Sequence, residues 1–248
     1  MGCDKKGLPM ATDLEYINLF NSCTISPLKS AEINRIIDDK ILTNKSRYQS
    51  VRNKLLNLTE YTYRNSCFVD EPDEGLLKKN PKIANGFFNR SFSDTGLFPE
   101  SAGIPWYFIA CVHYRESNSD FTKHLHNGDP LSGFTRQYPA NRPKISHGPP
   151  FSFEESAVDA LKLRGLDKET VWSLPKVLLR LEQYNGVAKA YQTNNINSPY
   201  LWGGSNLYTK GGFPRDHVFS LDYVNKQVGT AVILKAMENR GIINIPRQ

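Results

Sequence analysis

A single glutamate is the first candidate for chemistry in this sequence of 248 residues. Glu116 follows the most apolar stretch of the chain, residues 104–112, and lies at the end of a predicted helix. Burial there disfavours the ionised carboxylate, and the negative end of the helix dipole does the same. Both effects raise the pKa, so Glu116 could act as the general acid that protonates a glycosidic oxygen. A solvated ion pair with Arg115 or Lys123 is the alternative interpretation.

The polar segment after Glu116 offers a second carboxylate. A glycosidase commonly uses a second carboxylate as a nucleophile or as the base for a water molecule. Asp129 is the better candidate, because Asp120 is only one turn beyond Glu116 and is expected to bond the chain locally. Residues 127–130, Asn-Gly-Asp-Pro, also have the composition of a turn, in which Asp129 would bond only its own backbone.

Histidines in the same region support a rival site. His113, His124 and His126, together with Glu116 and Asp129, supply enough nitrogen and oxygen ligands for a catalytic zinc or iron ion. Their spacing matches no strict metal motif, and H-E-x-x-H in particular is absent. We therefore expect no cofactor and no bound metal, and a metal-dependent hydrolase stays as an alternative.

Aromatic and amide side chains further along the chain could line a sugar-binding cleft. Tyr and Trp rings can stack on sugar rings, and Asn and Ser side chains can hydrogen-bond amide and hydroxyl groups. The candidate substrate-binding residues are His126, Thr135, Tyr184, Asn185, Tyr200, Trp202, Asn206 and Tyr208. Any of the aromatic residues could instead attach a long loop to the core.

The elements that must position these residues are mostly helices. Apolar periodicity, N-cap residues and terminal glycines predict their bounds. The expected helices span residues 14–20, 26–55, 105–116, 153–164, 174–184 and 221–240. Ser152 and Glu155 predict a capping box at the start of the 153–164 helix, and Ser220 is expected to cap the last helix.

A small β element is expected between the helices. Alternation and an Asn-Gly pair predict a β-hairpin between residues 127 and 138. Residues 1–25 are interpreted as an N-terminal leader and residues 59–103 as an insertion. The sequence therefore predicts a mainly α (α+β) fold, with one domain over residues 26–248.

Composition narrows the class of protein. The chain is 39% hydrophobic and 23% charged, which is typical of a globular protein, and its longest apolar run is too short for a transmembrane segment. The formal net charge of +6 suits an anionic cell wall, and no basic block is dense enough to predict nucleic-acid binding. Four scattered cysteines predict reduced thiols, with Cys111 in the core. We expect a monomer.

The N-terminal residues bear on localisation. They carry lysines without an apolar stretch behind them, so the sequence predicts no secretory signal. A cytoplasmic phage lysin and export by a non-classical route both stay open.

Several motifs resemble those of known proteins. Glu116-Ser117 at the end of a buried helix, with Phe121 shortly after, resembles the Glu-Ser motif of lytic transglycosylases and goose-type lysozymes. The run Gln183-Tyr184-Asn185-Gly186 is similar to their Ala-Tyr-Asn-Ala-Gly motif. Longer segments resemble lysozyme-like proteins of bacteria and phages, and the resemblance covers residues 30–58 and 104–242. These segments are residues 104–106, 113–117, 124–131, 149–157 and 200–202.

The resemblance implies a lysozyme-like fold and cleavage of the glycan strands of peptidoglycan. Glu116 matches the catalytic acid of this superfamily, and Asp129 falls on the second acid of goose-type lysozymes. A working second carboxylate implies hydrolysis by water, as in a muramidase, and its absence implies the anhydro product of a lytic transglycosylase. A glycan-binding module without activity is a further alternative.

Overall fold

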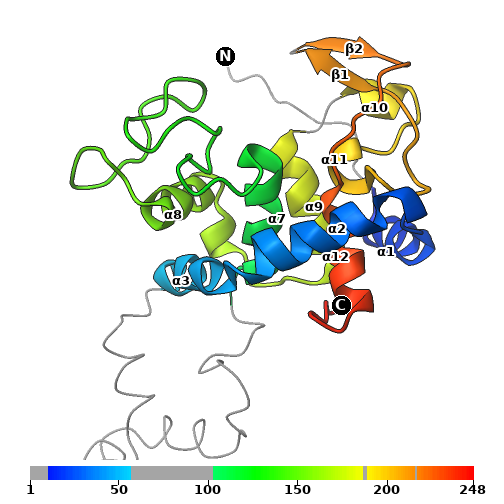
Figure 1. The fold of residues 1–248 in the computed structure, drawn as a ribbon, viewed down its shortest axis with the longest axis horizontal. Helices are drawn as coiled ribbons and strands as arrows, with labels where there is room; N and C mark the ends of the chain where they lie inside the picture. Colours follow the sequence, from blue (N-terminus) through cyan, green and yellow to red (C-terminus); the bar gives the residue numbers. More distant parts are fainter. Residues whose placement is uncertain (1–10, 57–102, 187–188, 216) are drawn as a thin grey trace, which may run out of the picture.

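The computed structural model describes residues 11–56, 103–186, 189–215 and 217–248, and this part of the chain is mainly helical (Figure 1). Its α-helices are α1 (Asp13–Ser22), α2 (Ser30–Arg35), α3 (Lys45–Leu55), α7 (Trp106–Ser117), α8 (Phe153–Leu163), α9 (Leu174–Asn185), α10 (Lys189–Thr193), α11 (Pro199–Trp202) and α12 (Thr230–Asn239). Two 3-10 helices, η1 (Pro27–Lys29) and η3 (Leu166–Lys168), and a π-helix, η2 (Ile36–Leu42), complete the helical elements described.

Helix α7 is the central element of the core. All side chains from Trp106 to Tyr114 are buried, as expected for a helix that is apolar on every side. It contacts α3, α9 and α12, and it lies between them in Figure 1. Asn118 ends the helix in the left-handed conformation, with φ of 57°. The predicted helix over 105–116 is confirmed, and Cys111 is fully buried as expected.

Helices α8 and α9 also begin and end close to the predicted residues. Ser152 and Glu155 form the predicted capping box of α8, and Gly165, with φ of 67°, follows its end. Pro175 lies in the first turn of α9, and Gly186 ends it with φ of 84°. Local capping residues are therefore sufficient to define these two helices.

Helix α1 belongs to the same core as the other helices. Its Tyr16 and Phe20 side chains are buried in the main cluster, and the Tyr16 hydroxyl donates a hydrogen bond to Glu182 on α9. Residues 13–22, predicted as part of a leader, are thus integrated into the domain. The predicted insertion at 59–103 lies, except for its last residue, outside the described residues.

The long helix predicted over 26–55 is interrupted. Its apolar stripe is buried as expected, but the chain passes through η1, α2 and η2 before α3 begins at Lys45. At the break, the Thr43 hydroxyl donates to the Asp38 carbonyl and the Asn44 amide donates to the Lys40 carbonyl. Such side chains compete with the backbone for helix carbonyls, which ends one helix and starts another.

The predicted β-hairpin between residues 127 and 138 is wrong. These residues form turns and loops, with one isolated bridge between Lys123 and Pro130. The antiparallel pair β1 (Gly212–Arg215) and β2 (Val218–Ser220) instead follows α11 and precedes α12 in the chain, and it lies next to α10 in Figure 1. The backbone N–H groups of Arg136 and Gln137 donate to the Asp129 carboxylate rather than to a partner strand.

The last helix is shorter than predicted, because α12 begins at Thr230 rather than at residue 221. Leu221 and Val224, which fall within the predicted helix, lie outside α12 and are exposed. The backbone of Gly229 crosses close to α11, where its N–H donates to the Gly203 carbonyl at 2.8 Å. This crossing fixes the chain in an extended form just before the helix starts.

Within the described ranges, no helix has both the length and the apolar character needed to cross a membrane.

Candidate functional site

Glu116 lies in the last turn of α7, and its side chain is half-buried. The hydroxyl of Tyr200 donates a hydrogen bond to its Oε1 atom at 3.1 Å. Burial raises the pKa of the Glu116 carboxyl, and it outweighs the Tyr200 hydrogen bond and the charges of Arg115 and Arg164, which act in the opposite direction. The carboxyl group is therefore shifted toward the protonated form that a general acid needs.

Tyr200 is placed by the short helix α11. Its side chain is buried, and burial raises the pKa of the phenol well above its usual value, so the hydroxyl stays a proton donor. The guanidinium of Arg115 lies over the Tyr200 ring, 4.7 Å from its centroid, and donates to the Val228 carbonyl at 3.2 Å. Contacts between α7, α11 and the segment before α12 thus hold the Tyr200 phenol beside Glu116.

Tyr184 connects the same region to the loop after α7. Its hydroxyl donates to the Leu125 carbonyl at 3.0 Å, and the guanidinium of Arg164 lies 4.7 Å from the centroid of its ring. The turn that follows Leu125 lies over the end of α7, because a Cβ atom on Gly128 would be 3.2 Å from the Glu116 carbonyl oxygen. The 124–129 turn is therefore part of the surroundings of Glu116.

Asp129, the predicted second acid, is engaged within its own loop. Its Oδ2 atom accepts hydrogen bonds from the N–H groups of Arg136, at 2.7 Å, and Gln137, at 3.2 Å, and from the Asn127 amide at 2.9 Å. Burial tends to raise the pKa of Asp129, but these hydrogen bonds outweigh it and lower the pKa. The structure thus gives Asp129 a structural task, and its catalytic role stays a prediction.

The three histidines of the rival metal site have hydrogen-bond partners at both ring nitrogens. His113 contacts the Tyr48 hydroxyl and the Asp120 carbonyl. The other two share Ser156, and their second nitrogens face a carbonyl or a carboxylate; these contacts are His124 with Ser156 and Gly133, and His126 with Ser156 and Asp159. Among the described residues, no three His, Cys, Asp or Glu side chains gather as metal ligands. Geometry therefore gives the metal alternative no support.

The other predicted sugar-binding residues differ in how exposed their side chains are. Thr135, Trp202 and Tyr208 are buried, as is His126, and Thr135 and Tyr208 bond nearby backbone atoms. Asn206 is exposed, but its amide bonds the backbone of Ser22 and Thr24. Asn185 is exposed at the end of α9. Of the predicted set, Tyr200 contacts Glu116 directly and Tyr184 lies in the shell around it.

Two cations near Glu116 were not predicted as site residues. Arg115, which precedes Glu116 in the sequence, was considered only as its partner in a solvated ion pair. Arg164 comes from the end of α8, and only the tertiary arrangement brings its charge to the carboxyl group.

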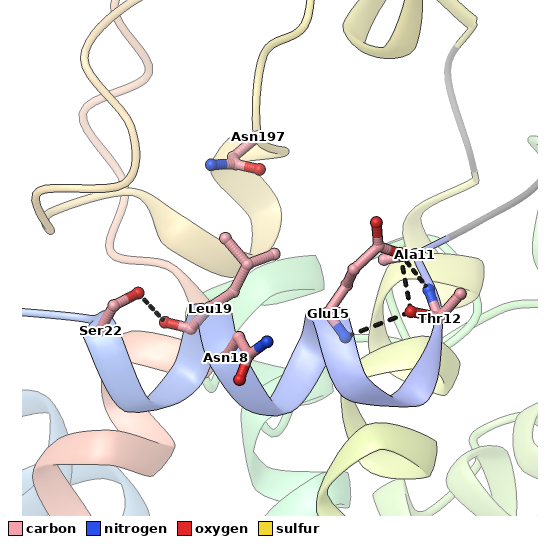
Figure 2. A pocket seen from close by; sticks show the side chains of 7 residues that line it. All are labelled: Ala11, Thr12, Glu15, Asn18, Leu19, Ser22 and Asn197. Atoms are coloured by element: carbon pink, nitrogen blue, oxygen red, sulfur yellow. Dashed lines mark hydrogen bonds between the residues drawn. The ribbon is translucent and has the colours of Figure 1, made fainter.

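A separate pocket of about 770 Å³ lies beside α1, and Figure 2 shows Asn197, from the segment before α11, across from this helix. It is lined by Ala11, Thr12, Glu15, Asn18, Leu19, Ser22 and Asn197. Several of its polar groups are already engaged, since Glu15 bonds Thr12 and the Ser22 hydroxyl bonds the Leu19 carbonyl. The pocket contains none of the predicted site residues.

Comparisons with protein-family models, with curated proteins and with solved structures found no match for this chain.

Proposed function

We propose that this protein cleaves the glycan strands of bacterial peptidoglycan with Glu116 as the general acid, on a lysozyme-like fold. The observation that carries the proposal is the half-buried carboxyl group at the end of α7, whose pKa burial raises and whose Oε1 accepts the Tyr200 hydroxyl. A carboxyl group whose pKa is raised keeps its proton to a higher pH than a solvated glutamate does, and can give it to a leaving glycosidic oxygen.

The surroundings of Glu116 support the same chemistry. The phenol of Tyr200 orients one carboxyl oxygen, which leaves the other free of that contact for substrate. The charges of Arg115 and Arg164 oppose the rise in the pKa of Glu116. They would therefore stabilise the carboxylate that is left once Glu116 has given its proton to the substrate. The motifs that resemble lytic transglycosylases and goose-type lysozymes fall on the same residues, namely Glu116 and Tyr184.

The choice between hydrolysis and transglycosylation depends on Asp129. An ionised Asp129 that activated water would give a reducing sugar end. If Asp129 only shapes its loop, the sugar's own 6-hydroxyl would close on the anomeric carbon and give an anhydro end. Both outcomes require Glu116.

The test compares two glutamates in similar surroundings. Glu182 is also shielded from water, burial also raises its pKa, and it also accepts a tyrosine hydroxyl, from Tyr16. On purified cell wall, Glu116→Gln should lower the rate of fragment release at least about a hundredfold, which is the usual contribution of a general acid. Glu182→Gln should keep the wild-type rate.

The outcomes separate the candidate functions. Wild-type activity in Glu116→Gln, with unchanged circular dichroism, would exclude the proposed role. Loss of activity on treatment with a chelator would favour the metal-dependent alternative. Wall binding without release of fragments by the unmodified protein would favour a binding module.

A further inference from the structure

The loop between α7 and α8 presents an exposed aromatic ring that the proposed chemistry does not use. Tyr138 is 92% exposed and lies in the middle of residues 135–142, within the connection between α7 and α8 that loops out beside α8 in Figure 1. A tyrosine so exposed contributes little to the core. Its ring is therefore accessible to a ligand.

Hydrogen bonds close the base of this loop tightly. The N–H of Thr135 donates to the Arg142 carbonyl at 2.9 Å, and the N–H of Asn141 donates to the Thr135 carbonyl at 2.8 Å. The Thr135 hydroxyl donates to the Pro139 carbonyl and accepts from the Arg142 N–H. Arg142 in turn pairs with Asp159 on α8. The backbone that carries Tyr138 is therefore fixed to a helix.

The tip of the loop is also fastened to the turn over Glu116. Asp129 accepts the N–H groups of Arg136 and Gln137, and the Asn127 amide donates to the Gln137 carbonyl at 3.1 Å. Gly128, between Asn127 and Asp129, lies against the carbonyl of Glu116. A continuous set of contacts thus connects the end of α7 to the residue before Tyr138.

The side chains at the tip are complementary to an aminosugar. Arg136, Gln137 and Tyr138 are consecutive and all exposed, and they offer a guanidinium, an amide and an aromatic face. The aromatic face suits the C–H face of a pyranose ring, the amide suits an N-acetyl group and the guanidinium suits a carboxylate. Peptidoglycan offers all three, with pyranose rings and N-acetyl groups on its glycan strands and carboxylates on its stem peptides, whereas a lipid surface would favour a larger apolar patch.

We infer that Tyr138 is a sugar-stacking residue of a glycan subsite, and that Asp129 is the positioning residue that holds its loop. This inference rests on the proposed glycan substrate and adds a binding contact outside the predicted site residues. The ring packs on a pyranose of the same strand that Glu116 cleaves.

Binding is tested on insoluble purified wall with the Glu116→Gln protein, so that cleavage does not alter the substrate. Adding Tyr138→Ala should weaken retention about three- to tenfold, the range measured for aromatic contacts. Tyr138→Trp should preserve retention, and Tyr138→Leu should behave like Tyr138→Ala. Leu28→Ala, which removes an apolar side chain that is 95% exposed on η1, is the matched control and should change nothing.

Asp129→Asn tests the positioning step. Loss of the charge weakens the hold on the Arg136 and Gln137 N–H groups, so retention should fall in the same direction as for Tyr138→Ala. In the active protein, KM should rise while kcat stays close to the wild-type value. A fall in kcat with unchanged retention, or a changed product end, would assign Asp129 to catalysis instead and overturn its positioning role.

Unchanged retention in Tyr138→Ala would overturn the inference. Full retention in Tyr138→Leu, or equal binding of the protein to anionic phospholipid vesicles through Tyr138, would also overturn it, because an apolar contact would then suffice. If the unmodified protein binds wall through Tyr138 but releases no fragments, the subsite stands and the proposed cleavage fails. If it cleaves wall and Tyr138→Ala has an unchanged KM, only the subsite fails.

Discussion

At the scale of single residues, Glu116 and Glu182 show that a raised pKa alone does not define a site. Burial raises the pKa of both, and a tyrosine hydroxyl contacts both. They differ in their neighbours, because Arg115 and Arg164 face Glu116, whereas Glu182 pairs with Tyr16 between α1 and α9. The two cations therefore distinguish Glu116 from Glu182: they oppose the rise in its pKa and would stabilise the carboxylate that remains after the proposed proton transfer.

Tyr200→Phe tests this tuning through the pH dependence of activity. The Tyr200 hydroxyl stabilises the ionised carboxylate, so its removal should raise the pKa of Glu116 further. A general acid works when protonated, and the alkaline limb of the kcat profile should therefore move to higher pH. Tyr16→Phe, which removes the equivalent hydroxyl from Glu182, should leave the profile in place. A shift of the limb to lower pH in Tyr200→Phe would contradict this account.

The sequence was enough to nominate Glu116 and Tyr200 as site residues, but not to predict the hydrogen bond between them or the nearby charge of Arg164. The apolar run before Glu116 and the capping signals predict where α7 lies, and hence that this carboxyl is shielded. Trp202 and Tyr208 were nominated as sugar contacts from residue type alone. Both side chains are buried in the structure. Residue type alone did not predict this, because it does not show which aromatic side chains the tertiary fold places in the core.

At the scale of elements, local signals predicted the helices whose ends have caps. The ends of α8 and α9 match, since Ser152, Glu155, Pro175 and Gly186 act on their own turns. The start of α12 and the position of the hairpin depend on contacts between distant segments. At the start of α12, the Gly229 backbone bonds the end of α11. In residues 127–138, the alternating pattern could not show that the Asp129 side chain, rather than a partner strand, would accept the backbone N–H groups.

Gly229→Ala tests the crossing that defines the start of α12. A Cβ atom at residue 229 would lie 2.2 Å from the Leu201 carbonyl oxygen and 2.7 Å from the Gly203 nitrogen, which are backbone atoms that cannot move aside easily. The free energy of unfolding should fall by about 3 kcal/mol or more. Gly148→Ala, which meets nothing within 4 Å, is the control and should stay within about 0.5 kcal/mol. Urea denaturation measures the stability of both variants. A Gly229→Ala protein as stable as the Gly148→Ala protein would contradict the close contact between Gly229 and α11.

At the scale of the whole molecule, two buried histidines should make stability depend on pH. Burial lowers the pKa of His113 to about 4, although Asp120 and Glu154 oppose this and Arg47 adds to it. Burial likewise lowers the pKa of His126 to about 4, against Asp159 and together with His124 and Arg142.

The sign of this dependence follows from the lowered pKa values. Between pH 6.5 and 4, the unfolded chain binds protons at these histidines and the folded chain does not. Stability is therefore full above pH 6.5 and falls as the pH decreases, by up to about 3 kcal/mol for each histidine. Urea denaturation between pH 7.5 and 4.5 measures the slope.

The control for this measurement is the Glu116→Gln, Glu182→Gln double variant. It removes two carboxyl groups whose raised pKa acts in the opposite direction, so the decrease in stability should become steeper. A stability that is constant or rises on acidification in this variant would contradict the burial of neutral histidines.

The most direct test of the central claim is mass spectrometry of purified cell wall after digestion, because it identifies the bond that is broken. The unmodified protein and Glu182→Gln should release fragments with new reducing or anhydro sugar ends, and Glu116→Gln should release essentially none. Fragments cut only at peptide bonds, or identical sugar ends from Glu116→Gln at the wild-type rate, would contradict the assignment of Glu116 as the proton donor.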